Sequence, residues 1–250
     1  MKRLLGAMLA IVLVPSTGST SRAEDKDTQA ILDKAIQALG GEEKLKKAES
    51  ATWKTKATIT FNGNDSALSI HSTVQGLDHY RAEIEGEFGG NEFKGVVVVN
   101  GNKGWRTFPE KMEIDADGLA NEKRQIYLLV IPARILPLKD KGFKLEAAGE
   151  DKVGEKPAVA IKVTPPDGKE FTLAFDKESG LPVKLVARVV GFRGDEYTQE
   201  TTYADYKDFD GIKKATKVVS KRDGEKFRDE QITEFKVLDK VDPKTFSEPE

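Results

Sequence analysis

The chain contains no cysteine and only two histidines among 250 residues. Without cysteine it can form no disulfide, offer no thiol nucleophile and carry no lipid on a cysteine at a cleavage site. We therefore expect a fold that depends on its hydrophobic core alone. His71 and His79 are interpreted as surface residues, since two imidazoles without a third clustered ligand make a weak metal site.

Enzyme motifs are also absent. The sequence has no Gly-x-Ser-x-Gly motif, no phosphate loop that ends in Gly-Lys-Ser/Thr and no His-Glu-x-x-His pair. Nearly all carboxylates fall in turns or on the polar sides of predicted strands, so no pair is singled out for hydrolysis. We predict a protein without enzymatic activity and without a cofactor.

One acidic segment approaches the pattern of a calcium loop. Residues 113–124 place oxygen-bearing side chains and Gly118 at the required spacing, but the twelfth position is Arg124, where a calcium loop needs a bidentate glutamate. We interpret this segment as a solvated acidic turn before a helix, and we predict no metal site.

The chain also lacks an excess of either positive or negative charge. The chain has 40 Lys and Arg against 42 Asp and Glu, and its lysines are interspersed with acids, as in residues 42–47. A protein that binds phosphate backbones needs a continuous basic stripe. Nucleic acid is therefore not an expected partner.

The start of the chain has the pattern of a secretory signal peptide. Lys2 and Arg3 precede an apolar run from Leu4 to Val14, and small residues at positions 21 and 23 suit cleavage before Glu24. This run is too short to cross a bilayer as a helix. We predict export to the periplasm, removal of residues 1–23, and a soluble, unanchored mature chain.

The rest of the chain, residues 24–250, contains no long Pro/Gly/Ser linker, so we expect one domain. Asp27 suits the N-cap of an amphipathic helix that ends at Gly40-Gly41, and a short helix is predicted for Glu42 to Ala48. About eleven alternating segments follow, joined by short turns, and only antiparallel neighbours can be joined in this way. The prediction is a mainly β (α+β) fold, an antiparallel meander that is either open or curled into a barrel.

A helical segment, Leu119 to Leu138, interrupts these strands. Its apolar stretch from Ile126 to Ile131 has no polar face, so it should lie inside a concavity of the sheet, and Pro132 and Pro137 are expected to break it. Two interpretations stay open, a plug of ordinary core or a lid over a cavity for an apolar ligand. Membrane insertion is disfavoured, because Arg134 and both prolines interrupt so short a run.

Several local sequences resemble those of the periplasmic lipoprotein carriers, the LolA/LolB-like family. They are Ala35 to Gly41, the hairpin Phe171 to Pro182, Tyr203 to Gly211, and Ile232 to Val237 with Pro243 and Phe246 close behind. Together with the predicted signal and the central apolar helix, the resemblance covers most of the mature chain. It implies a half-open barrel of about eleven strands, with an apolar cavity that receives acyl chains.

The resemblance also implies a site, in which Leu119 to Leu138 forms the lid. The carriers' functional arginine falls on Arg81, Arg106 or Arg134. Aromatic side chains suit acyl chains because they offer a large apolar area with few rotatable bonds. The predicted ligand-binding residues are Trp53, Phe61, Trp105, Ile126, Leu129, Val130, Ile131, Arg134 and Phe171.

The expected function is a monomeric, non-enzymatic carrier or chaperone that shields acyl chains of a lipid or lipoprotein in the periplasm. Fold alone does not fix function, and this fold also occurs in envelope-stress regulators. The alternative is therefore a module that binds a protein partner in the envelope and takes up no lipid.

Overall fold

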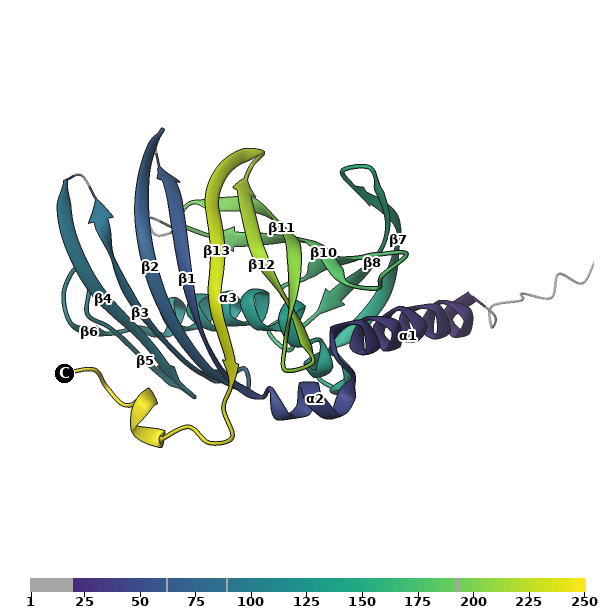
Figure 1. Cartoon of the computed structure of the whole chain (residues 1–250), viewed down its shortest axis with the longest axis horizontal. Helices are drawn as coiled ribbons and strands as arrows, with labels where there is room; N and C mark the ends of the chain where they lie inside the picture. The colour runs from purple at the N-terminus through teal and green to yellow at the C-terminus, as the bar shows by residue number, and fades with distance from the viewer. Residues whose placement is uncertain (1–19, 62, 89, 192–193) are drawn as a thin grey trace, which may run out of the picture.

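A strongly curved antiparallel sheet wraps around one long helix (Figure 1). The computed structural model describes residues 20–250 except 62, 89 and 192–193, and the side chains of residues 20–26, 61 and 88 also lie outside the description. Most of the predicted signal peptide, residues 1–19, is thus outside the described residues. Its cleavage before Glu24 stays a prediction.

The described chain forms two meanders. The first comprises β1 (Ser50–Phe61), β2 (Asn64–Gln75), β3 (His79–Phe88), β4 (Asn91–Asn100), β5 (Lys103–Arg106) and β6 (Met112–Glu113). The second comprises β7 (Lys144–Val153), β8 (Lys156–Thr164), β9 (Phe171–Asp176), β10 (Pro182–Val190), β11 (Glu196–Phe209), β12 (Ile212–Arg222) and β13 (Glu225–Val237). β1 pairs with β13, so that 13 strands lie in the order β6-β5-β4-β3-β2-β1-β13-β12-β11-β10-β9-β8-β7.

The helices lie at the start of the described chain and in the connection between the meanders, and one 3-10 turn follows β13. They are α1 (Thr20–Leu39), α2 (Glu42–Lys47) and α3 (Ala116–Arg134), with the 3-10 turns η1 (Leu136–Lys139) and η2 (Pro243–Phe246). Because β6 and β7 are the two edges of the sheet, α3 crosses its concave side from one edge to the other (Figure 1). No helix in the described part of the chain is long and apolar enough to cross a membrane.

The predicted mainly β antiparallel meander is confirmed, with differences at its edges. About eleven strands were expected and 13 are present, because the two-residue β6 and the strand β7 escaped sequence reasoning. β7 is exposed along most of its length and lacks apolar alternation. At the other end, α1 begins at Thr20, so that Asp27 lies within the helix and is not its N-cap.

The central helix also differs from its prediction. Pro132 lies inside α3, which continues to Arg134, although a proline was expected to break it. The helix stays intact because its burial outweighs the missing backbone donor, a loss of about 3 kcal/mol in an isolated helix. The acidic turn before it is the N-cap, since Asp115 Oδ1 accepts a hydrogen bond from Gly118 N at 2.8 Å.

One half of the concave side is filled by helices. The C-terminal part of α3 packs with α1, α2 and strands β8 to β10 in a continuous apolar cluster. Its fully buried members include Leu32, Ile36, Leu39, Leu45, Ile131, Ile135, Ile161, Phe171, Leu173, Phe175 and Leu185. This cluster, called the α1 cluster below, holds the C-terminal end of α3 against the sheet.

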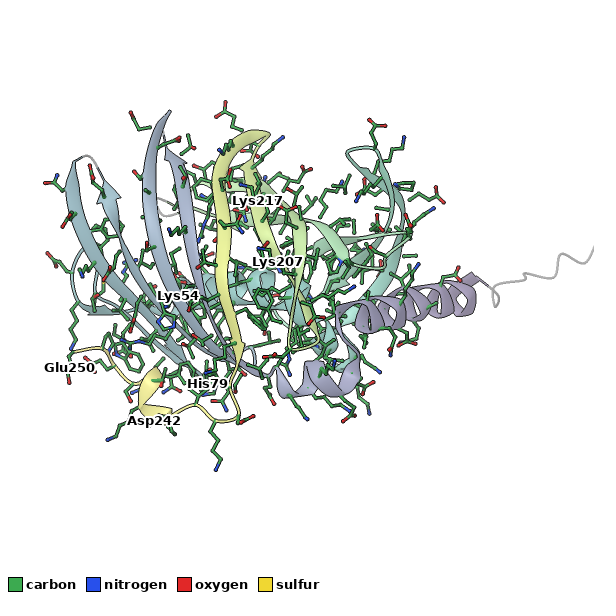
Figure 2. The ribbon with its side chains drawn as sticks, in the orientation of Figure 1. Lys54, His79, Lys207, Lys217, Asp242 and Glu250 are labelled. Atoms are coloured by element: carbon green, nitrogen blue, oxygen red, sulfur yellow. The ribbon has the colours of Figure 1, made fainter. Side chains whose placement is uncertain are left out.

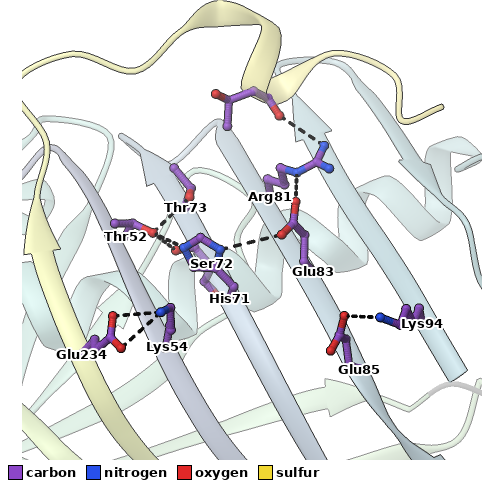
Figure 3. Close-up of polar contacts among 11 residues, drawn as sticks. Thr52, Lys54, His71, Ser72, Thr73, Arg81, Glu83, Glu85, Lys94 and Glu234 are labelled. Atoms are coloured by element: carbon purple, nitrogen blue, oxygen red, sulfur yellow. Dashed lines mark hydrogen bonds and ion pairs between the residues drawn. The ribbon is translucent and has the colours of Figure 1, made fainter. Parts of the chain in front are cut away.

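The outer face of β1 to β4 is polar (Figure 3). Lys54 Nζ lies 3.1 Å from Glu234 across the β1–β13 pair, and His71 Nε2 lies 2.8 Å from Thr52 Oγ1. The other histidine, His79, lies beside η2 and contacts the Phe246 ring, with 5.4 Å between ring centroids (Figure 2). Exposed ion pairs such as Lys54–Glu234 contribute little to stability. The main effect of these side chains is to keep the outer surface polar.

The junction between α1 and the β11–β12 turn gives a first test. Gly40 ends α1 at φ +133°, and a Cβ atom there would lie 2.3 Å from the carbonyl oxygen of Gly211. We expect Gly40→Ala to lower the free energy of unfolding by about 3 kcal/mol in urea titrations.

The matched control is Gly224→Ala, which has φ +88° but no atom within 4 Å of the new Cβ. It should cost about 1 kcal/mol from backbone strain alone. Equal losses for the two variants would contradict the close contact between α1 and the turn.

Candidate functional site

A cavity of 370 Å³ lies between α3 and the concave face of the sheet. One face of α3 forms one wall, with Glu122, Gln125, Ile126, Leu128, Leu129, Pro132 and Ala133. Most of these residues recur at intervals of three and four, which is the spacing that places helical side chains on one side. β1 to β4 and β11 to β13 form the opposite wall.

The alternation along β1 explains the sheet wall. Trp53, Thr55 and Ile59 line the cavity, whereas Lys54 and Lys56 between them point to the outer face, where Lys54 meets Glu234. Successive side chains of a strand lie on opposite faces, so an alternating sequence produces one apolar and one polar face. β2 and β3 continue the inner wall with Leu68, Ile70, Ser72, Tyr80, Ala82 and Ile84.

The two interpretations of the central helix, ordinary core and cavity lid, each describe one part of it. Ile131 and Ile135 are fully buried against the α1 cluster and form ordinary core. On the side of α3 that faces the cavity, Leu129 is 37 % exposed. The helix is not apolar all round, because Glu122 and Gln125 lie on that same side. α3 is therefore core at one side and cavity wall at the other.

The nine residues predicted from the sequence are not brought to one place. Trp53, Ile126 and Leu129 line the cavity. Val130 is buried in the adjoining cluster with Trp53 and Ile126 but is not part of the lining. Ile131 and Phe171 belong to the α1 cluster, so neither faces the cavity.

The remaining three lie elsewhere or cannot be placed. Trp105 pairs with Val98 on β4 and alternates with Arg106, whose partner Val97 lines the cavity, so Trp105 lies on the outer face. Arg134 donates from Nε to the Leu45 carbonyl at 3.3 Å and ties α3 to α2. Phe61 ends β1, and its side chain is outside the described part.

The three candidate arginines occupy three different environments. Arg81 is on the outer face and pairs with Glu83 at 2.9 Å. Arg134 contacts α2, as described above. Arg106 shares the inner side of the sheet with Val97, and its positive charge counteracts the burial that raises the pKa of the Glu122 carboxyl. Arg106 is thus on the same face of the sheet as the cavity lining.

Lys214 is the functional candidate that sequence reasoning missed. It lies on β12, lines the cavity and is only 6 % exposed. Its Nζ lies 4.8 Å from the centroid of the Trp53 ring and 5.1 Å from that of Phe235. Burial lowers its pKa to about 8, while the negative charge of Glu230 acts in the opposite direction. The available signal was a lysine two residues after Ile212, at a position where the alternation of β12 requires an inward side chain.

The part of the cavity wall formed by β12 and β13 carries further charged side chains. Arg228 pairs with Glu230 at 2.7 Å, and Arg222 donates from Nε to Gln199 Oε1 at 3.1 Å while its guanidinium lies over the Phe227 ring. The cavity is therefore amphipathic, whereas the resemblance implied an apolar one. The described residues contain no group of three or more side chains able to hold a metal ion.

Stability measurements can test the buried lysine. Because the pKa of Lys214 falls from 10.5 to about 8 on folding, the unfolded chain binds more protons between these pH values, and the charged lysine destabilises the folded state below about pH 8. Lys214→Met should raise the free energy of unfolding at pH 7 by about 1–3 kcal/mol, since cation–π contacts offset part of the cost. This gain should shrink as the pH rises from 8 toward 10.5.

The neighbouring Lys213, which is exposed, provides the control. Lys213→Met should change the free energy of unfolding by less than about 0.5 kcal/mol at either pH. A Lys214→Met protein that is less stable than the wild type at pH 7 would show that this buried charge is compensated.

Comparison with known proteins supplies the fold's identity. No family model and no curated protein matches the sequence. A LolA superfamily protein from Nitrosomonas europaea superposes with a TM-score of 0.58 at 11% identity, covering 88% of this chain and 97% of that one. A DUF1329 family protein from Desulfovibrio piger gives 0.56 at 14% identity, with 88% and 97% covered. A domain described as an outer membrane lipoprotein-sorting protein, from Vibrio parahaemolyticus, gives 0.54 at 10% identity, with 86% and 97% covered. The chain has a LolA-like fold, as the sequence resemblance predicted.

Proposed function

We propose that the protein is a non-enzymatic carrier that holds an acyl chain of a lipid or lipoprotein in the cavity between α3 and the sheet. The observation that carries the proposal is a solvent-accessible apolar side chain, Leu129, on the cavity wall of an otherwise well-packed helix. Burial of this surface against an apolar ligand is favourable, because removing apolar area from water lowers the free energy.

The size of the cavity supports a single chain. Its volume of 370 Å³ is near the lower end of the range of about 300–1,000 Å³ that small-molecule sites occupy. Each buried methylene contributes about 0.8 kcal/mol, so a long acyl chain gains enough to compete with membrane or micelle. A ligand with several chains would require α3 to move away from the sheet.

One prediction and one comparison also fit this function. The predicted signal peptide would take the chain to the periplasm, where an acyl chain in transit must be kept from water. The Vibrio parahaemolyticus domain with the same fold is described as a lipoprotein-sorting protein. The monomeric state, the periplasmic location and the absence of enzymatic activity are parts of this proposal.

A charge on the cavity wall should abolish binding without unfolding the protein. Leu129→Glu places a carboxylate where the acyl chain lies, and because Leu129 is partly exposed, the variant should lose less than about 1.5 kcal/mol of unfolding free energy. Retention of lipid after purification should fall at least tenfold, measured by native mass spectrometry and lipid extraction.

The matched control is Met112→Glu, which changes an exposed apolar residue on β6, outside the cavity lining. It should retain lipid as the wild type does. Equal retention by a folded Leu129→Glu protein would exclude the cavity as the acyl site. A wild-type protein that takes up no lipid and copurifies with an envelope protein would support the alternative, a protein-binding module.

A further inference from the structure

The lysine on the cavity wall has no hydrogen-bond or ion-pair partner in the part of the chain that the structure describes, and Glu230 acts on its charge only at longer range. Among the residues that the structure describes, Lys214 Nζ takes part in no hydrogen bond or ion pair, and its contacts are the faces of Trp53 and Phe235. An ammonium group carries three donors, and leaving them unsatisfied in a buried site is costly. Whatever fills the cavity next to Lys214 has to provide the acceptor.

Several other polar groups of the lining are already paired. Tyr80 Oη lies 3.2 Å from Ser72 Oγ, and Thr201 Oγ1 lies 3.0 Å from Ser220 Oγ. Tyr206 Oη donates to the Pro182 carbonyl at 2.7 Å. These paired groups need nothing from a ligand, whereas Lys214 has unused donors, as does Arg228, whose buried Nε has no hydrogen-bond partner among the described residues.

The charges around Lys214 leave room for one more negative group. On β13, Glu230 is engaged by Arg228 at 2.7 Å, and on α3 burial raises the pKa of the Glu122 carboxyl. A ligand with a negative head group would restore the balance that the protein does not provide.

The position of Lys214 also fits the end of a chain-shaped ligand. It contacts Trp53 near the start of β1, and the apolar lining continues from there along β1 to Ile59 and along the paired strand to Leu68. Six residues of strand extend about 20 Å, which is close to the length of a long acyl chain. An amphiphile can therefore place its head group at Lys214 and its chain between β1, β2 and α3.

We propose that Lys214 is the head-group site of the cavity and that it binds the anionic group, carboxylate or phosphate, of a single-chain amphiphile. This inference rests on the proposed function, because it assumes that the apolar part of the cavity holds the acyl chain. It adds the class of ligand: a fatty acid or a phosphate monoester, in preference to a neutral lipid.

The test compares three ligands of equal chain length by calorimetry at pH 7: hexadecanoate, hexadecyl phosphate and hexadecanol. The wild-type protein should bind one or both anions at least about tenfold more tightly than the alcohol, and the tighter anion identifies the head group. Lys214→Met should lose this preference while its affinity for hexadecanol stays unchanged. Lys214→Arg should retain part of the preference, and Lys213→Met, next to it on the outer surface, should bind as the wild type does.

The outcomes separate the two proposals. If Lys214→Met binds the anions as tightly as the wild type, or if Lys213→Met loses them equally, the head-group site is wrong while the carrier function stands. If the wild-type protein binds none of the three ligands, both proposals fail. Thermal unfolding of every variant confirms that the comparison is made between folded proteins.

Discussion

The central constraint of this structure is that the chain must pass from one edge of the sheet to the other. β6 and β7 are consecutive strands, yet they are the two outermost strands of a 13-stranded sheet, because β1 and β13 pair in its middle. The connection cannot run along the sheet without displacing a strand. It crosses the concave side as α3, about 28 Å long for its 19 residues, and so places a helix where a cavity can form.

The cavity exists because the packing of α3 leaves part of its surface uncovered. Ile131 and Ile135 are fully buried against the α1 cluster, and each such side chain contributes about 1.5–3 kcal/mol on burial. No second helix fills the space on the opposite side of α3, under β1 to β4, in the described part of the chain. The curvature of the sheet keeps its wall at a distance there, and Leu129 is left partly exposed. The same helix can therefore serve as core and as ligand wall without changing its position.

Sequence patterns predicted the fold better than the site. Apolar alternation and turn residues revealed most strands, and Gly40-Gly41 correctly marked the end of α1, where both glycines adopt positive φ. β7 was missed because both of its faces meet water over most of its length. Pro132 was misread because local propensity cannot account for tertiary burial. Both errors come from information that neighbouring strands and helices supply, which is absent from a local window.

The site was harder because a strand pattern shows which face a residue takes but not what lies against that face. Trp53 and Phe171 both occupy apolar faces, yet one faces the cavity and the other packs under α1. Trp105 was assigned to the site although the register of β5 turns it outward.

Lys214 was overlooked for the opposite reason, since one charged residue in a strand is usually read as solvent-facing. In the folded chain burial lowers its pKa, so we expect an apolar side chain of similar length to be more stable at this position. A buried lysine on a cavity wall, with no hydrogen-bond or ion-pair partner among the described residues, points to ligand binding, because a ligand can supply the interaction that folding does not.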